Sequence, residues 1–407
     1  MKHDLIYDWN DAGDAPRRPA RRIEFDDETL RDGLQSPSAI SPGIDQKIEI
    51  VRLMDALGID TADIGLPGAG ATVMADTLAV ARAMADEKMR IAPNCAARTL
   101  EADIRPIVEI AQKTGRPMAV AMFIGSSPIR QYAEEWTLQS IADHTRRATE
   151  FAVKNGIEVM YVTEDTTRAH PKDLETLFLT AIEAGARRLC LCDTCGHATP
   201  HGVARLVSWT RALLDDRKLS HVRIDFHGHM DRGLGVWNSI AALQAGADRL
   251  HGTALGIGER VGNTPLDQLL VNLKLMGWID NDLTRLYEYC TTVSRHAQVP
   301  IPNGYPVSGR DAFGTATGVH AAAIVKALRK GDAWLADRVY SGVPAGDFGR
   351  EQEIAIGPMS GKSNVVHWLE LRGHPVTEPR VAAILERAKR SDRLLTEEEI
   401  LDVVRKG

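Results

Sequence analysis

The chain has 407 residues, of which 44% are hydrophobic, 26% charged and 5% aromatic, and this balance excludes disordered and fibrous proteins. Lys and Arg total 49 against 55 Asp and Glu, so the formal net charge is −6, and the sequence contains no long basic run, which argues against nucleic acid as a partner. No stretch approaches the roughly 18 apolar residues of a membrane span, and the polar N-terminus has no hydrophobic signal core, so we expect no membrane partner.

From residue 21 onward, short β-forming runs alternate with helical patterns. The predicted strands are 22–25, 59–64, 90–93, 119–123, 159–162, 188–192, 222–226 and 249–253. The helical patterns include 45–57, 72–86, 138–154, 171–184, 236–245 and 266–276. Eight such units in about 255 residues match the size of a (β/α)8 barrel, so we predict an α/β fold with a TIM barrel over residues 21–277.

Beyond residue 277 the alternation stops, and residues 278–407 read as a smaller helical C-terminal region. Segments 300–306 and 342–349, which contain Pro and Gly, interrupt it. Helical patterns at 378–391 and 396–405 close the chain, and the second starts with the capping-box spacing Thr396-x-x-Glu399. Residues 1–20 form an N-terminal extension, and we expect no further domain after the last helix.

Polar or glycine-containing segments follow all eight predicted strands, where barrel enzymes place their catalytic residues. In chain order they are Arg31 to Gly33, Gly65, Asn94, Gly125 to Ser127, Glu164 with Asp165, Asp193 with Thr194, His227 to His229, and Gly256 to Asn263. Because the carboxyl ends of parallel strands meet at one rim of the barrel, we expect a functional site there.

The pair His227 and His229 is the sharpest local signal for a metal. Residues i and i+2 of an extended chain point to the same side, so both imidazoles can bind one ion. Asp32 follows the first strand, which adjoins the last strand when the barrel closes, and it supplies a carboxylate. Two histidines and one carboxylate leave positions open for substrate, as in catalytic metal sites. The alternative is an ordinary pair of polar rim or core histidines.

Two other features carry weaker signals. The spacing Cys192-x-x-Cys195 has no second pair for zinc, so we interpret the cysteines near the sixth strand as buried thiols; five cysteines also suit a reducing, cytoplasmic compartment. The stretch 256–263, with Gly258 and Glu259, lacks the spacing of a dinucleotide loop, and we expect it to approach a ligand through its backbone. His320 alone reads as a histidine at a helix start.

Three separated motifs, residues 27–37, 227–235 and 256–263, together resemble those of the DRE-TIM metallolyase superfamily. Within it the chain is most similar to the 2-isopropylmalate, homocitrate and citramalate synthases. The resemblance implies a divalent metal, Zn²⁺, Mg²⁺ or Mn²⁺, held by Asp32, His227 and His229, with Asn263 as a possible fourth ligand.

The resemblance also implies roles for other residues. Arg31 faces the substrate oxygens, Glu164 and Thr194 line the 2-oxo acid site, and His320 with Tyr340 form a catalytic pair delivered by the helical region. The implied reaction joins acetyl-CoA to a 2-oxo acid, and a homodimer is the implied assembly. An amino-acid feedback domain, which fuller 2-isopropylmalate synthases carry, is not expected.

Two positions depart from the synthase pattern, since Leu34 replaces the usual Glu and Met230 the usual Asn. With Leu66 they favour a branched apolar substrate such as 2-oxoisovalerate, because a second carboxylate needs a cationic partner. Homocitrate or citramalate synthesis remains an alternative. Leu34 also occurs in the hydroxymethylglutaryl-CoA lyases, so C–C cleavage is a rival reaction, and a barrel that only binds ligands is a further one.

Overall fold

The computed structural model describes residues 5–13 and 18–406, so part of the expected N-terminal extension lies outside the described residues. The described chain divides into two compact units. Among the described residues, the first comprises those up to Asp282 together with Thr292–Pro300, and the second comprises Leu283–Thr291 together with those from Ile301 onward. The helix α10 (Leu286–Ala297) contributes residues to both units, so the division does not follow a single cut in the chain.

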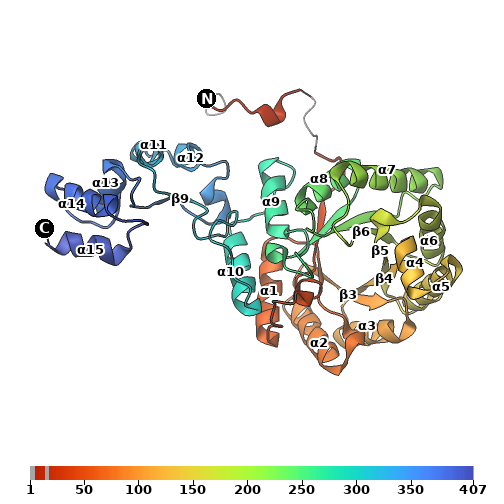
Figure 1. The fold of residues 1–407 in the computed structure, drawn as a ribbon. Coiled ribbons are helices and arrows are strands. Elements are labelled where there is room, and N and C mark those ends of the chain that lie inside the picture. The colour runs from red at the N-terminus through yellow and green to blue at the C-terminus, as the bar shows by residue number, and fades with distance from the viewer. Residues whose placement is uncertain (1–4, 14–17, 407) are drawn as a thin grey trace. The chain divides into compact units, whose positions relative to one another are not determined.

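Eight parallel strands of the first unit form one closed barrel in chain order (Figure 1). They are β1 (Glu24–Asp27), β2 (Thr61–Asp63), β3 (Ala92–Arg98), β4 (Ala119–Gly125), β5 (Glu158–Glu164), β6 (Arg188–Asp193), β7 (Arg223–Gly228) and β8 (Arg249–Gly252). The barrel closes where β1 pairs with β8, with Glu24 opposite Arg249 and Asp27 opposite Gly252. This closure confirms the predicted TIM barrel and brings the first and last strand ends together.

Helices surround the strands, as the predicted alternation requires (Figure 1). They are α1 (Ile44–Ala56), α2 (Ala71–Asp86), α3 (Glu101–Thr114), α4 (Pro128–Glu134), α5 (Leu138–Lys154), α6 (Pro171–Glu183), α7 (Pro200–Asp216), α8 (Gly235–Ala245) and α9 (Leu266–Leu275). The helix α5 shows why they form, since Thr137 caps its first turn and Ile141, Thr145, Ala148 and Ala152 form one buried face at helical spacing.

The largest difference from the predicted strands concerns β3. The sequence placed Asn94 after a strand ending at Pro93, whereas β3 continues to Arg98 and contains both residues. Asn94 is buried, and its Nδ2 donates a hydrogen bond to Oδ1 of Asp26 at 2.7 Å across the barrel. This bond pairs the amide nitrogen of the side chain inside the barrel, so Asn94 belongs to the barrel interior and not to the rim.

The floor of the barrel is charged. Arg249 donates to Asp225 at 2.7 Å, and Arg188 pairs with Asp225 at 2.8 Å and with Glu24. The apolar core lies instead between the strands and the helices, where residues such as Ile50, Ile104 and Phe178 are almost fully buried. The ion pairs therefore lie inside the cylinder, at the floor of the barrel.

The second unit is mainly helical, as expected for the C-terminal region. It holds α11 (Gly318–Arg329), α12 (Ala333–Arg338), α13 (Lys362–Leu371), α14 (Glu378–Lys389) and α15 (Glu397–Lys406), with a two-stranded ladder of β9 (Gly314–Thr315) and β10 (Glu353–Ile354). Helices α13 to α15 share a small apolar core around Val365, Leu369 and Ile384. Within residues 5–13 and 18–406, no helix combines the length and the apolar character needed to cross a membrane.

Candidate metal centre and substrate cavity

Asp32, His227 and His229 lie together at the C-terminal rim of the barrel. Oδ2 of Asp32 is 3.8 Å from Nε2 of His227 and 3.7 Å from Nε2 of His229. One potential ligand atom of each residue lies within 4.8 Å of the other two, and all three residues are buried. These separations exceed hydrogen-bond lengths and suit three ligands around a common point. His227 is inside β7 and His229 directly follows it, so the spacing of two orients both rings to one side.

Asn263 completes this cluster from the loop after β8. Its Nδ2 donates to Oδ2 of Asp32 at 2.5 Å, while its Oδ1 is buried and has no hydrogen-bond partner among the described residues. A buried amide oxygen without a partner is costly unless a ligand satisfies it. Gly258 permits the close packing of this loop, because a Cβ at that position would lie 1.9 Å from Oδ1 of Asn263. The donor set of carboxylate, two imidazoles and amide oxygen therefore fits a divalent cation.

The two imidazoles stand in opposite electrostatic environments. Burial opposes the charged form of His227, but the carboxylates of Glu28 and Asp32 outweigh it and raise its pKa to about 9. Burial and the neighbouring His227 lower the pKa of His229 to about 4. The cluster thus holds negative charge on Asp32 and keeps His229 neutral, the state in which an imidazole binds a metal.

Arg31 is fixed beside the cluster by carboxylates on two sides. Its Nε donates to Oδ2 of Asp63 at 2.7 Å and its Nη1 to Oδ1 of Asp32 at 2.8 Å. Burial raises the pKa of Asp63 to about 7, although the guanidinium of Arg31 acts in the opposite direction. Sequence reasoning had no role for Asp63, which positions the arginine.

A cavity of about 140 Å³ opens next to the metal cluster. Arg31, Glu164, Thr194 and Glu259, all predicted to face the substrate, line it. The predicted substrate-binding residues Leu34 and Gly258 do not line it, and neither do Leu66 and Met230. Its full lining is Glu28, Arg31, Asp32, Gln35, Ala121, Phe123, Val162, Glu164, Cys190, Cys192, Thr194, His227, His229, Glu259 and Arg260. The apolar wall consists of residues of β4 and β5, namely Ala121, Phe123 and Val162.

Glu164 and Thr194 lie at the ends of neighbouring strands. Burial raises the pKa of Glu164, with Arg130 acting against the shift from 3.6 Å, so this carboxyl keeps a proton to higher pH than an exposed glutamate. Oγ1 of Thr194 accepts a hydrogen bond from the backbone N–H of Asp165 at 2.8 Å, which fixes the hydroxyl at the cavity wall.

His320 and Tyr340 meet in the second unit. Their ring centroids are 4.2 Å apart and the ring planes are inclined by 31°. His320 is exposed near the start of α11, and 48% of the Tyr340 surface is accessible. Two exposed aromatic groups held against each other provide an imidazole with an adjacent phenol, which is the pairing expected from the sequence.

The cysteines near the cavity are free thiols. Cys190 and Cys192 are buried on β6, where their sulfur atoms lie 3.8 Å apart, and Cys195 is partly exposed. Burial raises the pKa of both buried thiols, so they are neutral at physiological pH. They act as small apolar groups at the cavity floor.

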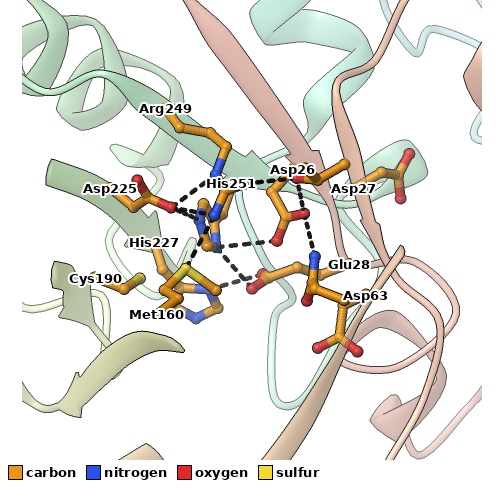
Figure 2. Close-up of polar contacts among 12 residues, drawn as sticks. Asp26, Asp27, Glu28, Asp63, Met160, Cys190, Asp225, His227, Arg249 and His251 are labelled. Carbon is orange, nitrogen blue, oxygen red and sulfur yellow. Dashed lines mark hydrogen bonds and ion pairs between the residues drawn. The ribbon is translucent and has the colours of Figure 1, made fainter. Parts of the chain in front are cut away.

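Two residues that sequence reasoning gave no role, Glu28 and His251, lie next to His227 in the barrel interior (Figure 2). With His227 they form a second group of three potential ligands among the described residues. The sequence contained a signal for these residues in the alternation of polar side chains along three strands. The pairs with a spacing of two are Asp26 and Glu28, Asp225 and His227, and Arg249 and His251. Such residues share one face, here the barrel interior.

A larger hollow of about 660 Å³ lies in the second unit between α14 and α15. Several of its charged side chains are paired, Arg390 with Glu386, and Arg393 and Arg387 with Glu399. The groove therefore offers paired surface charges, in contrast to the converging ligands at the barrel rim.

Comparison with known proteins adds two kinds of finding. Residues 22–293 match the family model described as HMGL-like. A relative from Methanopyrus kandleri assigned as a 2-isopropylmalate synthase is 31% identical over 371 residues, covering 90% of this chain and 69% of the relative. A homocitrate synthase from the same organism is 31% identical over 405 residues, 96% of this chain and 95% of the relative.

A relative from Methanosphaerula palustris assigned as an (R)-citramalate synthase is 30% identical over 371 residues, covering 90% of this chain and 69% of the relative. Among solved structures, hydroxymethylglutaryl-CoA lyase from Pseudomonas aeruginosa superposes with a TM-score of 0.59 at 18% identity, covering 72% of this chain and 98% of the lyase. At that identity the superposition supports the barrel fold alone.

Proposed function

The chain belongs to the HMGL-like family, and we propose that it condenses acetyl-CoA with a 2-oxo acid to give a 2-alkylmalate and free CoA. The relatives named for 2-isopropylmalate, homocitrate and citramalate synthesis are similar to the chain along nine tenths of its length or more. They act on 2-oxo acids that differ in the side chain, so the choice among these acids depends on the cavity wall.

The apolar wall is the observation that favours 2-oxoisovalerate. Ala121, Phe123 and Val162 line the cavity that also contains the metal cluster, and they match a branched aliphatic side chain. Of the arginines that line this cavity, Arg31 is held by Asp63 and Asp32 and is assigned to the oxygens that every 2-oxo acid carries, and Arg260 is held by Asp231 at 2.8 Å. A second substrate carboxylate would be buried among apolar groups, which costs several kcal/mol without a cation. The proposed activity is therefore that of a 2-isopropylmalate synthase.

When bound, a divalent ion held by Asp32, His227, His229 and Asn263 supplies Lewis-acid polarisation of the keto group. Arg31, kept charged by its carboxylate neighbours, stabilises negative charge on the substrate oxygens. We assign the hydroxyl of Thr194 to the oxo-acid carboxylate, and Glu164, whose pKa burial raises, to a substrate oxygen. We assign proton exchange at the acetyl group, or at the water that hydrolyses the thioester, to His320, with Tyr340 orienting its ring.

The test is a panel of 2-oxo acids with acetyl-CoA, in which a thiol reagent follows the release of CoA. We expect the highest kcat/KM with 2-oxoisovalerate and a lower value with pyruvate and 2-oxoglutarate. A preference for 2-oxoglutarate would assign homocitrate synthesis, and a preference for pyruvate would assign citramalate synthesis. Cleavage of hydroxymethylglutaryl-CoA without any condensation would replace the proposal by a lyase.

We propose in addition that the protein is a homodimer, because the resemblance to the synthases implies that the helical region of one chain serves a partner. Light scattering at assay concentration should give about twice the 44.5 kDa of one chain. A monomer that is fully active at that concentration would contradict this assembly.

A further inference from the structure

A continuous line of charged groups runs from the metal cluster into the barrel (Figure 2). Oε2 of Glu28 lies 2.7 Å from Nδ1 of His227, and Oε1 of Glu28 lies 2.9 Å from Nδ1 of His251. Nε2 of His251 lies 3.1 Å from Oδ2 of Asp225, which Arg249 also contacts. Glu28 thus bridges two imidazoles that come from different strands, β7 and β8.

The hydrogen-bond partners fix the protons on both rings. Both nitrogens of His251 face carboxylate oxygens, which only accept, so both carry a proton and the ring is an imidazolium. Glu28 is therefore a carboxylate whose Oε1 accepts from His251. Its Oε2 accepts from Nδ1–H of His227, so an ion that binds His227 does so at Nε2, after this nitrogen has released its own proton. That nitrogen is the one that faces Oδ2 of Asp32 in the metal cluster.

The two ligand histidines differ in this support. Nδ1 of His229 is buried and has no hydrogen-bond partner among the described residues. The orientation of His229 therefore depends on its position directly after β7 and on the isolated backbone β-bridge that pairs His229 with Asn263. His227 alone is locked by a charged partner on its far side.

Glu28, His227 and His251 could be read as a second ion site, but their distances oppose this. Ligands at about 2.0–2.1 Å from a tetrahedral ion are about 3.3 Å apart. The two contacts of Glu28, at 2.7 and 2.9 Å, are instead hydrogen-bond lengths. A single ion at the upper cluster is the arrangement that these distances support.

We propose that Glu28 is a positioning residue that holds His227 with Nδ1 protonated and Nε2 directed at the ion, and that His251 and Asp225 hold Glu28. This inference rests on the proposed metal centre. Partners of this kind change metal affinity by about 10–100-fold when they are removed, because the ligand ring then samples other tautomers and orientations. The metal would bind more weakly even though every ligand is retained.

The experiment measures Zn²⁺ affinity directly, by competition with a chromophoric chelator, in the full-length protein and in two variants. Glu28→Gln keeps the volume and removes the charge, and Glu28→Asp keeps the charge but withdraws it from His227. Each variant is expected to bind one Zn²⁺ about 10–100-fold more weakly than the unaltered protein. The matched control is Glu24→Gln, which removes a carboxylate from the other end of β1, where Arg188 and Arg223 contact it.

The control variant should melt at a lower temperature and still bind Zn²⁺ with unchanged affinity. Nitrogen-15 spectra of the histidines in the Zn²⁺-loaded protein provide a second readout, in which Nδ1 of His227 carries the proton unless Glu28 is replaced. If Glu28→Gln does not fold, Glu28→Asp decides.

Three results would overturn the inference in different ways. Equal affinities in the unaltered protein and the variants would refute the positioning role and leave the metal centre intact. Two bound ions per chain would convert the Glu28 cluster into a site of its own. If the unaltered protein binds no Zn²⁺, Mg²⁺ or Mn²⁺ at millimolar concentration, the metal centre itself is wrong.

Discussion

Replacing Asp225 by Asn should destabilise the barrel strongly. The side chain is fully buried. Its Oδ2 lies 2.6 Å from Nη2 of Arg249 and 3.1 Å from Nε2 of His251, and its Oδ1 lies 2.8 Å from Nη1 of Arg188. The amide of Asn keeps the volume but leaves these buried cations without their carboxylate. Loss of one partner of a buried ion pair costs about 3–5 kcal/mol. At roughly 2–4 °C per kcal/mol, Tm should fall by about 6–20 °C.

Thermal unfolding followed by circular dichroism measures this effect, with Glu109→Gln as the matched control. Glu109 contacts Lys113 at 3.3 Å on the exposed face of α3. Of the two side chains, 56% of Glu109 and 50% of Lys113 is accessible to solvent. An exposed pair at this spacing contributes about 0.3–0.5 kcal/mol, so the control should melt within about 2 °C of the unaltered protein. If the Tm of Asp225→Asn differs from that of the unaltered protein by no more than the Tm of this control does, the reasoning is refuted.

The effect of Asp225→Asn should also depend on pH. Burial opposes the charge of Asp225, but Arg249 and Arg188 outweigh it and hold the pKa of this carboxyl well below its usual range. Because the pKa is lower in the folded than in the unfolded state, the stabilisation is complete above the unfolded value of about 3.9 and is lost as the pH falls below it. The gap in stability between the two proteins should therefore be constant near neutral pH and narrow below about pH 4.

Three predictions concern catalysis. His320→Ala should bind metal with unchanged affinity and lower kcat by about 10²–10⁴-fold in steady-state assays, and an unchanged kcat would remove the role assigned to this imidazole. Asp32→Asn should lose metal binding, measured by titration. Chelator treatment of the unaltered protein should abolish CoA release until Zn²⁺ or Mn²⁺ is restored. Full activity in the presence of chelator would contradict the metal centre. Phe123→Ala should raise the kcat/KM for 2-oxo acids longer than 2-oxoisovalerate, relative to the kcat/KM for 2-oxoisovalerate itself, by about 10–200-fold. An unchanged ratio of these two values would show that β4 does not set selectivity.

The eight strands could be predicted because each is bounded by turn residues and followed by a helical pattern, yet their ends could not. The first strand was expected at 22–25, whereas β1 is Glu24–Asp27. Asp26 and Asp27 are poor strand formers, and a pattern that seeks apolar residues treats them as a loop. In the folded chain Asp26 accepts hydrogen bonds from Thr61 on the neighbouring β2 and from Asn94 on β3, so the tertiary contacts outweigh the local preference.

The metal cluster was accessible from the sequence for a geometric reason. The spacing of His227 and His229 fixes them on one side of a strand, and barrel closure brings Asp32 next to them without any knowledge of side-chain contacts. Glu28 was not accessible in the same way, because its role depends on His227 and His251, which lie 199 and 223 residues away in the sequence. The apolar wall was also misplaced, since Leu34, Leu66 and Met230 do not line the cavity.

In the proposed site, metal binding and side-chain selectivity lie on different strands. The proposed ligands and the carboxylates and imidazoles beneath them come from β1, β7 and β8 with their following loops, whereas Ala121, Phe123 and Val162 come from β4 and β5. A change of apolar wall can therefore alter the accepted 2-oxo acid without disturbing the ligands. This division explains why overall similarity, 30–31% to relatives named for three different acids, does not discriminate among them. On our proposal a few residues on two strands determine that choice, because a substrate side chain contacts only the wall it faces.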